Sequence, residues 1–392
     1  MDNEDSILID PKTLESKPIR NERTPRAKTK EIIPAEDTKF YNRGGRVTVK
    51  FESNGRFSAP PEMYFTDYSV EHVNDLTLST LETIYETLIS IMDRIKNPDA
   101  GVSITELTIE EFLEALVGIK LQFNTYKHIH RWIDDCQINA SDKERKISEV
   151  EIDLRTIQYR SIEQAELDLR KFYKENYFDE WTDEEFKEYL INRYAEEPLD
   201  DIDTWTREQE LETIMIKEPI NYKHPDTGNL YSFKLMRVGD LLEAQKLIRL
   251  KYDPKIRIIK NRPNPHGVML LEVQEQKERE IQAIKENEAK EAILYAQAMT
   301  LIKFNGKEIS SHEERYELFK ELTRGDQFDF SDFLSHIQFG IYDERELTCN
   351  LCGKPSKRLL QQEFTPIELL PLDIDTQRAH RKRARGTIYF GV

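Results

Sequence analysis

The spacing of apolar residues predicts a chain made largely of amphipathic helices. Two segments repeat apolar residues every three or four positions, which places them on one face of a helix. Each has a Ser or Thr followed three residues later by Glu, the capping-box signal of a helix start. Ser79 with Glu82 should open the first helix, and Thr108 with Glu111 the second. The apolar positions are Leu81, Ile84, Leu88, Ile91 and Ile95, then Phe112, Leu116, Ile119 and Phe123.

A longer helical pattern runs from about residue 270 to 304. Its first part, 272–291, is charged nearly all round, so we expect it to project into solvent or lie along a partner. Its second part is apolar enough to be buried. A turn at Asn305-Gly306 should end this helix, and shorter helices are expected at about 312–322 and 331–338.

Strand-like alternation is confined to short segments beside turn residues. Val47 and Val49 alternate before Asn54-Gly55, a pair that suits a two-residue hairpin because both positions tolerate positive φ. Pro60-Pro61 should end that pairing, and a second hairpin is expected at 219–235. No strand–helix–strand alternation indicates a parallel sheet. The sequence therefore predicts an α+β fold, predominantly helical, with a few short β-hairpins.

Composition suggests two domains flanked by two tails. Residues 1–40 are rich in charge and proline without apolar periodicity, which predicts a disordered arm. An N-terminal α+β domain is expected at 41–215, and a C-terminal α+β domain with the long helix at 216–372. Residues 373–392 form a basic tail. A length of 392 residues with 38% hydrophobic content allows two or three domains.

The charge of the chain limits the classes of partner. A formal net charge of −17 disfavours nonspecific binding to nucleic acid or to an anionic membrane. The segment 179–203 is strongly acidic and contains a third capping box, Thr182 with Glu185, whereas 378–385 carries five Lys or Arg and no acid. Either both are solvated surface, or the basic tail docks on an acidic face of this chain or of a partner.

Compartment signals point to the cytosol. No apolar run approaches the roughly 20 residues that span a bilayer, so no membrane partner is expected. The acidic N-terminus lacks the apolar segment of a secretory signal. Three cysteines in the whole chain argue against a disulfide framework and favour a reducing compartment.

A Cys-x-x-Cys-Gly turn near the C-terminus is the strongest candidate for a metal site. Cys349 and Cys352 have the spacing of half a tetrahedral zinc site, and Gly353 supplies backbone freedom. A complete site would recruit distant residues, because the chain holds one other cysteine. The candidate further ligands are Cys136 with His128 or His130, or else His336 or His380. The alternative is a tight buried turn without metal, and zinc is the one cofactor that the sequence suggests.

The two histidines at 128 and 130 allow two interpretations. Alternate residues on a strand would place both imidazoles on one face, which could support a metal. The favoured alternative is that this Tyr/His/Trp-rich stretch packs at a helix end.

Catalytic motifs are absent from the sequence. It contains no phosphate-binding loop, dinucleotide fingerprint, His-Glu-x-x-His or Gly-x-Ser-x-Gly motif. Paired acids such as Glu110-Glu111 fall in first helical turns, where carboxylates favour the helix dipole. No enzyme is expected.

The C-terminal tip is a candidate partner-binding segment. The apolar, strand-prone residues 386–392 follow the basic linker, so they could donate an edge strand to a neighbour or return to their own domain. The candidate partner-binding residues are Arg378, Arg381, Lys382, Arg383, Arg385, Tyr389 and Phe390.

The order of these elements resembles the baseplate hub assembly proteins, or hub and tail assembly chaperones, of T-even-type and other contractile-tailed phages. The likeness covers roughly 60–372 through short motifs. They are Leu107-Thr-Ile-Glu-Glu-Phe-Leu and Ile119-Lys-Leu, the hairpin at 219–235 with Val238-Gly-Asp-Leu-Leu, then Leu301-Ile-Lys-Phe-Asn-Gly-Lys, Phe339-Gly-Ile, Cys349-x-x-Cys352-Gly, Phe364-x-Pro366 and Leu369-Leu-Pro. The family tends to carry a Cys-x-x-Cys pair after the first helical region. Here His128, His130 and Cys136 occupy that place.

This resemblance implies a non-enzymatic protein that binds phage baseplate hub or tail proteins and helps the hub assemble. The expected location is the host cytoplasm during assembly. The alternative is a structural baseplate subunit retained in the virion tail. A zinc-containing protein associated with nucleic acid is less favoured, because the chain has no folded basic face in its sequence pattern.

Overall fold

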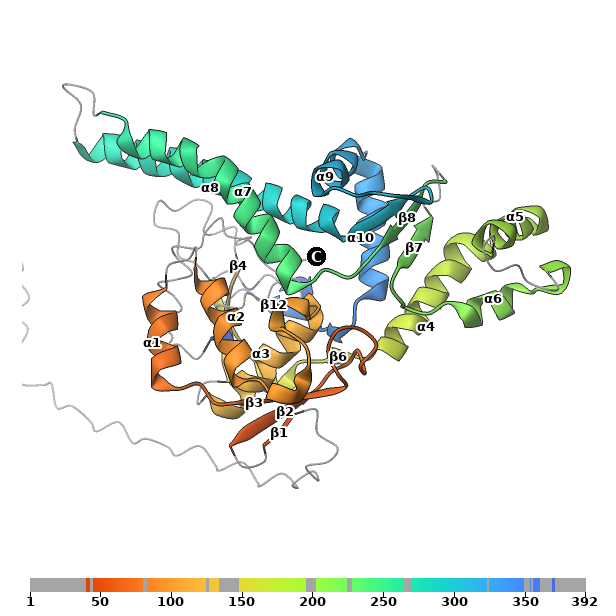
Figure 1. The fold of residues 1–392 in the computed structure, drawn as a ribbon, viewed down its shortest axis with the longest axis horizontal. Coiled ribbons are helices and arrows are strands. Elements are labelled where there is room, and N and C mark those ends of the chain that lie inside the picture. The colour runs from red at the N-terminus through yellow and green to blue at the C-terminus, as the bar shows by residue number, and fades with distance from the viewer. Residues whose placement is uncertain are drawn as a thin grey trace, which may run out of the picture. The chain divides into compact units, whose positions relative to one another are not determined.

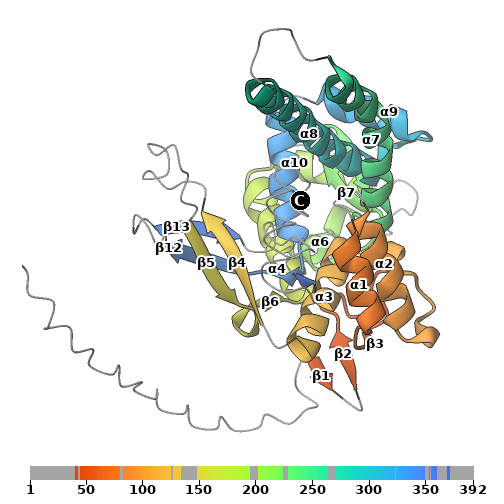
Figure 2. The same ribbon diagram turned by 90° about the vertical axis from the view of Figure 1, so that its left-hand side faces the viewer.

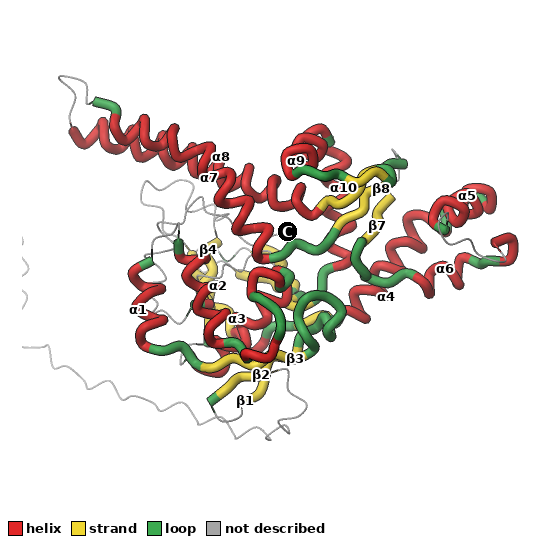
Figure 3. Tube along the Cα trace, viewed as in Figure 1, coloured by secondary structure: helices red, strands yellow, loops and turns green. Residues whose placement is uncertain are grey.

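The computed structural model describes residues 40–42, 45–79, 83–124, 127–133, 148–194, 202–223, 228–263, 270–322, 324–348, 353, 355–359 and 369–370. Helices hold more of these residues than strands do, and every strand pairing between the described elements is antiparallel (Figure 3). The predicted α+β, predominantly helical class is confirmed. The expected disordered arm, apart from Phe40, and the basic tail lie outside the described residues.

A three-stranded sheet and three helices form the first part of the fold (Figure 1). The strands, in the order β1-β2-β3, are β1 (Phe40–Asn42), β2 (Arg46–Lys50) and β3 (Glu62–Thr66). The helices are α1 (Val70–Leu78), α2 (Ile84–Ile95) and α3 (Ile109–Phe123). Helix α3 packs on β2, and its residues from Ile109 to Lys120 are buried except Glu110. This helix is therefore the centre of the N-terminal part.

The connection between β2 and β3 corrects the predicted two-residue hairpin. Asn54 and Gly55 have positive φ values of 50° and 74°, as expected, but they make a turn inside an eleven-residue loop, 51–61. The prolines do not end the pairing either. The carbonyl of Pro61 accepts a hydrogen bond from the Phe51 amide at 3.0 Å, and β3 begins at the next residue. A proline lacks the amide donor but keeps its acceptor, so it can border a strand.

Ser79 ends α1 and does not open a helix, which corrects a second expectation. Its backbone amide and its hydroxyl both donate to the Asp75 carbonyl, at 3.0 and 2.7 Å. Helix α2 begins at Ile84 instead, after Thr83. The Ser79 hydroxyl donates to a carbonyl of the preceding helix α1. The sequence motif alone does not show whether this hydroxyl caps the helix before it or the helix after it. The apolar positions of α2 that fall in the described residues are buried as predicted, and they are Ile84, Leu88, Ile91 and Ile95.

The capping boxes at Thr108 and Thr182 are confirmed. The Thr108 hydroxyl accepts from the Glu111 amide at 3.2 Å, and Glu111 Oε2 accepts from the Thr108 amide at 3.0 Å. Thr182 and Glu185 make the same reciprocal pair at the start of α5.

The middle of the chain holds a hairpin and a group of helices. β4 (His128–Ile133) pairs with β5 (Ser148–Asp153). A separate two-stranded ladder, formed by β12 (Glu344–Thr348) and β13 (Pro355–Leu359), comes from later in the chain (Figure 2). The helices are α4 (Ile162–Tyr173), a π-helical turn η4 (Lys174–Phe178), α5 (Asp183–Arg193) and α6 (Arg207–Thr213). Short 3-10 turns are η1 (Pro98–Ala100), η2 (Ile104–Glu106), η3 (Leu154–Thr156) and η5 (Ile202–Thr204).

A four-stranded sheet and a long helical hairpin make up most of the second part. The sheet order is β10-β9-β8-β7, with β7 (Ile220–Lys223), β8 (Leu230–Phe233), β9 (Leu301–Phe304) and β10 (Lys307–Glu308). The helices are α7 (Val238–Asn261), α8 (Leu270–Thr300), α9 (His312–Glu321) and α10 (Arg324–Ile337). The predicted hairpin at 219–235 and the Asn305-Gly306 turn are both confirmed.

Helix α8 ends at Thr300, and the last residues of its predicted pattern form β9. Its charged part lies along α7 of the same chain (Figure 1). Near the base of this pair Glu291 accepts hydrogen bonds from the hydroxyls of Tyr252 at 2.6 Å and Tyr316 at 2.7 Å, and it pairs with Lys251. These contacts join α7, α8 and α9.

Residues on both sides of the predicted boundary at 215/216 share one hydrophobic core. β6 (Tyr159–Arg160) pairs with β11 (Gly340–Ile341), and α4 packs on α10. The Arg160 guanidinium donates to the His336 carbonyl at 2.9 Å. Contacts of high sequence separation therefore hold the two parts together.

Candidate functional site

Buried carboxylates gather in the first two turns of α3. Glu111 closes the capping box, and its Oε2 also accepts from the Ala59 amide at 3.4 Å. Glu114 Oε2 accepts from the Glu52 amide at 3.1 Å. Both side chains are fully buried. They hold the 51–61 loop on α3, so their hydrogen bonds have a structural role.

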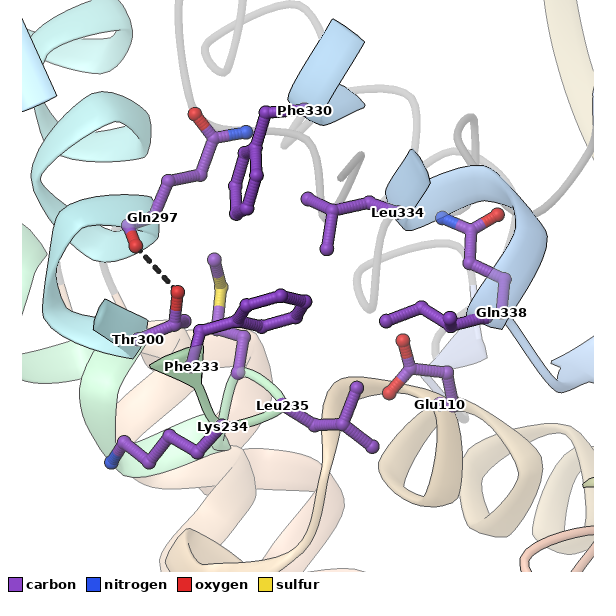
Figure 4. A pocket seen from close by; sticks show the side chains of 11 residues that line it. Glu110, Phe233, Lys234, Leu235, Gln297, Thr300, Phe330, Leu334 and Gln338 are labelled. Carbon is purple, nitrogen blue, oxygen red and sulfur yellow. Dashed lines mark hydrogen bonds between the residues drawn. The ribbon is translucent and has the colours of Figure 1, made fainter. Parts of the chain in front are cut away.

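Glu110 faces a small cavity where α3, β8, α8 and α10 meet (Figure 4). The cavity has a volume of about 30 Å³, and a space of this size holds about one or two water molecules. Burial of the carboxyl raises the pKa of Glu110 to about 7. The residues lining the cavity are mostly apolar, and Figure 4 labels Phe233, Leu235, Phe330 and Leu334 among them. This carboxyl faces room for water, not for an organic substrate.

The zinc candidates that the structure describes have different neighbours. His128 lies on β4, with Nδ1 3.3 Å from Glu151 Oε1 and Nε2 3.7 Å from Asp153 Oδ2. His336 lies on α10, where its ring packs on Phe172 with centroids 4.6 Å apart. Burial lowers the pKa of His336. Within the described ranges no three His, Cys, Asp or Glu side chains are grouped to hold a metal ion.

The remaining candidate zinc ligands lie in parts of the chain that the structure does not describe. Cys136, Cys349, Cys352 and His380 are outside the described residues, and so is the side chain of His130. The backbone of His130 belongs to β4, so the 128–130 stretch is a strand, and packing of this stretch at a helix end stays a prediction. In this strand His130 pairs in register with Glu151. Zinc binding stays a prediction.

The predicted partner-binding tail also lies outside the described residues. It comprises Arg378, Arg381, Lys382, Arg383, Arg385, Tyr389 and Phe390. Their role in binding a partner stays a prediction.

The acidic segment belongs to a group of helices that contains α5, η5 and α6, and in this group α6 packs on α4 (Figure 1). We call residues 179–213 the acidic arm. Glu210 of α6 is fully buried and accepts from the hydroxyls of Tyr189 and Tyr194 at 3.2 and 3.0 Å. It also accepts from Trp205 Nε1 at 3.0 Å and pairs with Arg193 at 2.6 Å. One buried carboxylate thus connects α5, α6 and the segment between them. Among the described residues of the arm, the exposed acids are Asp179, Glu180, Asp183, Glu184, Glu185, Glu188, Asp203, Glu208 and Glu212.

The outer face of α7 is the most coherent exposed apolar surface that the description contains. Leu247, Leu250 and Ile258 are 39%, 65% and 68% exposed, and Pro254 lies between them. Their spacing of three, four and four residues places all four on one stripe. The opposite face of α7 is buried toward α8 and includes Leu241, Ala244, Ile248 and Ile259.

This stripe has basic borders. Seven Lys or Arg and one acid, Asp253, occur from Lys246 to Arg262. Lys251 and Arg262 pair with carboxylates of α8. No carboxylate among the described residues pairs with Lys246, Arg257 or Lys260, which are exposed. We call Lys246, Leu247, Leu250, Pro254, Arg257, Ile258 and Lys260 the α7 outer face.

Sequence reasoning missed the α7 outer face. A second apolar stripe in the segment 238–261, on the side away from Leu241 and Ile248, was the signal that could have found it. Only the packing of α8 shows which of the two stripes is covered.

No family model matches the chain, and no curated protein or solved structure matches it either. None of the helices in the described ranges is both long and apolar enough to cross a membrane. The surfaces and contacts of the chain itself therefore carry the functional argument.

Proposed function

We propose that this chain is a non-enzymatic assembly protein of a contractile phage tail, which binds other tail proteins and helps the baseplate hub form. The observation that carries this proposal is the α7 outer face, an exposed apolar stripe on a regular helix. Contiguous exposed apolar surface of this kind marks protein-interaction sites. The motif resemblance of residues 60–372 to hub assembly proteins supplies the biological setting.

The electrostatics of this face favour an acidic protein as its ligand. Lys246, Arg257 and Lys260 border the apolar side chains without described carboxylate partners. Unlike charges across an interface speed association and reject wrong partners. Apolar burial supplies the affinity, at about 25 cal/mol per Å² of surface removed from water.

Capture of tail proteins from infected cells tests the proposal. We expect the tagged wild-type chain to retain hub or tail proteins, and Leu250→Glu with Ile258→Glu to retain at least about tenfold less, a loss of about 1.4 kcal/mol. The matched control is Gln274→Glu with Gln276→Glu, which adds the same charge at exposed positions of α8. Equal capture by both variants, or capture of no tail protein by the wild type, would contradict the proposal.

Mass spectrometry of purified particles separates the two forms of this function. A transient assembly protein is expected to be absent or far below stoichiometric level in the particle. A stoichiometric amount would instead identify a structural baseplate subunit.

A further inference from the structure

The acidic arm carries a surface that complements the α7 outer face. Glu184, Glu188 and Ile191 lie at i, i+4 and i+7 on α5, so they share one side of the helix. All three are exposed, and Ile191 is 52% exposed. We call these three residues the α5 outer face. It is an apolar side chain bordered by carboxylates, the reverse in charge of the α7 outer face.

The cations of α5 are already engaged inside the arm. Lys187 pairs with Asp203, and Arg193 pairs with the buried Glu210. No cation in the described part of the chain pairs with Glu184 or Glu188. The α5 outer face therefore keeps its negative charge available for a partner.

The α5 outer face is short enough to lie along the α7 stripe. The apolar stripe of α7 extends over twelve residues, from Leu247 to Ile258, and the α5 outer face extends over eight, from Glu184 to Ile191. At about 1.5 Å of rise per residue these lengths are roughly 18 Å and 12 Å. The shorter face can therefore pack on the α7 stripe over its whole length, which buries Ile191 against the apolar side chains of α7.

These two faces belong to different parts of the fold. Helix α6 packs on α4, and α5 contacts the η5 turn before α6, whereas α7 packs on α8 (Figure 1). Each face is exposed, so neither covers the other within one chain. Contact between different surfaces of identical chains is heterologous, or head-to-tail.

We infer that the α7 outer face of one copy binds the α5 outer face of a second copy of this chain, in a head-to-tail contact. This inference rests on the proposed use of α7 as a protein-binding surface and names one partner for it. Opposite charge lets a chain of net charge −17 associate with itself, because the basic face of one copy meets acids of the next.

Sedimentation of the purified full-length chain tests the inference. We expect oligomers that grow with protein concentration and weaken with added salt, which screens exposed charges. Lys246→Glu with Arg257→Glu, and separately Glu184→Lys with Glu188→Lys, should each weaken self-association at least about tenfold. Arg279→Glu with Lys290→Glu, which makes the same charge change as the α7 reversal at exposed positions of α8, should leave self-association unchanged.

Mixing the two charge-reversed variants gives the decisive measurement. Each variant alone presents like charges on both faces, but the mixture pairs an acidic α7 face with a basic α5 face. Self-association should return in the mixture to within a few-fold of the wild type. Far-ultraviolet circular dichroism should be unchanged in every variant, since all the substituted residues are exposed.

Several results would overturn the inference. A wild-type chain that stays monomeric at every concentration and at low salt would do so, as would a mixture that does not reassociate. Oligomers lost on reversal of α7 but kept on reversal of α5 would indicate an α7–α7 contact instead. The experiment contains no other tail protein, so a monomeric chain that still captures tail proteins would overturn this inference alone. A self-associating chain that captures none would overturn only the proposed function.

Discussion

Arg193 Nη1 lies 2.6 Å from Oε1 of Glu210, a carboxylate with no exposed surface. The same carboxylate accepts hydrogen bonds from Tyr189, Tyr194 and Trp205. Breaking such a buried pair from one side leaves the other charge and its donors without a partner. The stability of the acidic arm therefore depends on Glu210, a residue that is fully buried.

We expect Glu210→Ala to destabilise the protein by about 3 kcal/mol. Urea unfolding followed by tryptophan fluorescence measures this loss of stability, since Trp205 donates a hydrogen bond to the Glu210 carboxylate. The matched control is Glu208→Ala, an exposed residue of the same helix, which should change stability by no more than about 0.5 kcal/mol. Equal stability of the two variants would show that the buried network is not needed.

Gly340 is expected to tolerate no side chain. Its φ is +80°, and a Cβ there would lie 2.6 Å from Glu114 Oε1 and 3.3 Å from the Glu110 Cβ. Left-handed backbone costs a non-glycine residue about 1–2 kcal/mol, and overpacking adds about 1–3 kcal/mol. We predict that Gly340→Ala lowers the free energy of unfolding by about 2–5 kcal/mol.

Gly306→Ala is the control for the backbone contribution. Gly306 has a similar φ of +77°, but a Cβ there meets no atom within 4 Å. Gly306→Ala should lower the free energy of unfolding only by the backbone cost of about 1–2 kcal/mol, and urea denaturation of both variants measures the difference. A Gly340→Ala variant no less stable than Gly306→Ala would refute the steric argument.

Stability should fall as the pH rises toward neutrality because of Glu110. Burial raises its pKa from 4.5 to about 7, so between these values the folded chain holds a proton that the unfolded chain has lost. The stabilising effect of that proton is complete below about pH 4.5 and is lost as the pH passes 7, with a slope of at most about 1.4 kcal/mol per pH unit.

Glu110→Gln removes this titration without changing the size of the side chain. Relative to wild type, the variant should gain stability as the pH is raised from about 5 to about 8, in chemical denaturation at matched salt. Parallel pH profiles for the two proteins would show that Glu110 does not titrate in this range.

The zinc hypothesis predicts one bound zinc per chain in protein purified without chelator. Thiolate ligands dominate such sites, so Cys349→Ser with Cys352→Ser should abolish binding, and Cys136→Ser should weaken it if that thiol completes the site. Elemental analysis measures the content. Well under one equivalent in the wild type would reject zinc and leave the tight-turn interpretation.

Local chemistry made much of the helical structure predictable. The box at Thr108 and the buried stripe of α2 were read correctly because their interactions join residues three or four positions apart. Ser79 was misread because its hydroxyl had two possible partners, one in each direction along the chain. Asn54-Gly55 did not predict the long β2–β3 loop, which is held by contacts distant in the sequence, such as the hydrogen bond from the Glu52 amide to Glu114 of α3.

The α7 outer face illustrates the limit for a functional site. The sequence contains two apolar stripes on α7, and each alone has the spacing of a buried helix face. Helix α8 covers one stripe and leaves the other to solvent, so exposure is a property of the helix pair. No pattern within α7 distinguishes the two.

By itself, the sequence determined the predominantly helical class, two of three capping boxes and the 219–235 hairpin, because each depends on neighbours along the chain. Only the tertiary structure decided that Tyr159 and Arg160 pair with Gly340 and Ile341, and that Glu210 is buried at the centre of the acidic arm. Such contacts join residues far apart in the sequence, where many partners are chemically equivalent. The packing of the whole core selects among them.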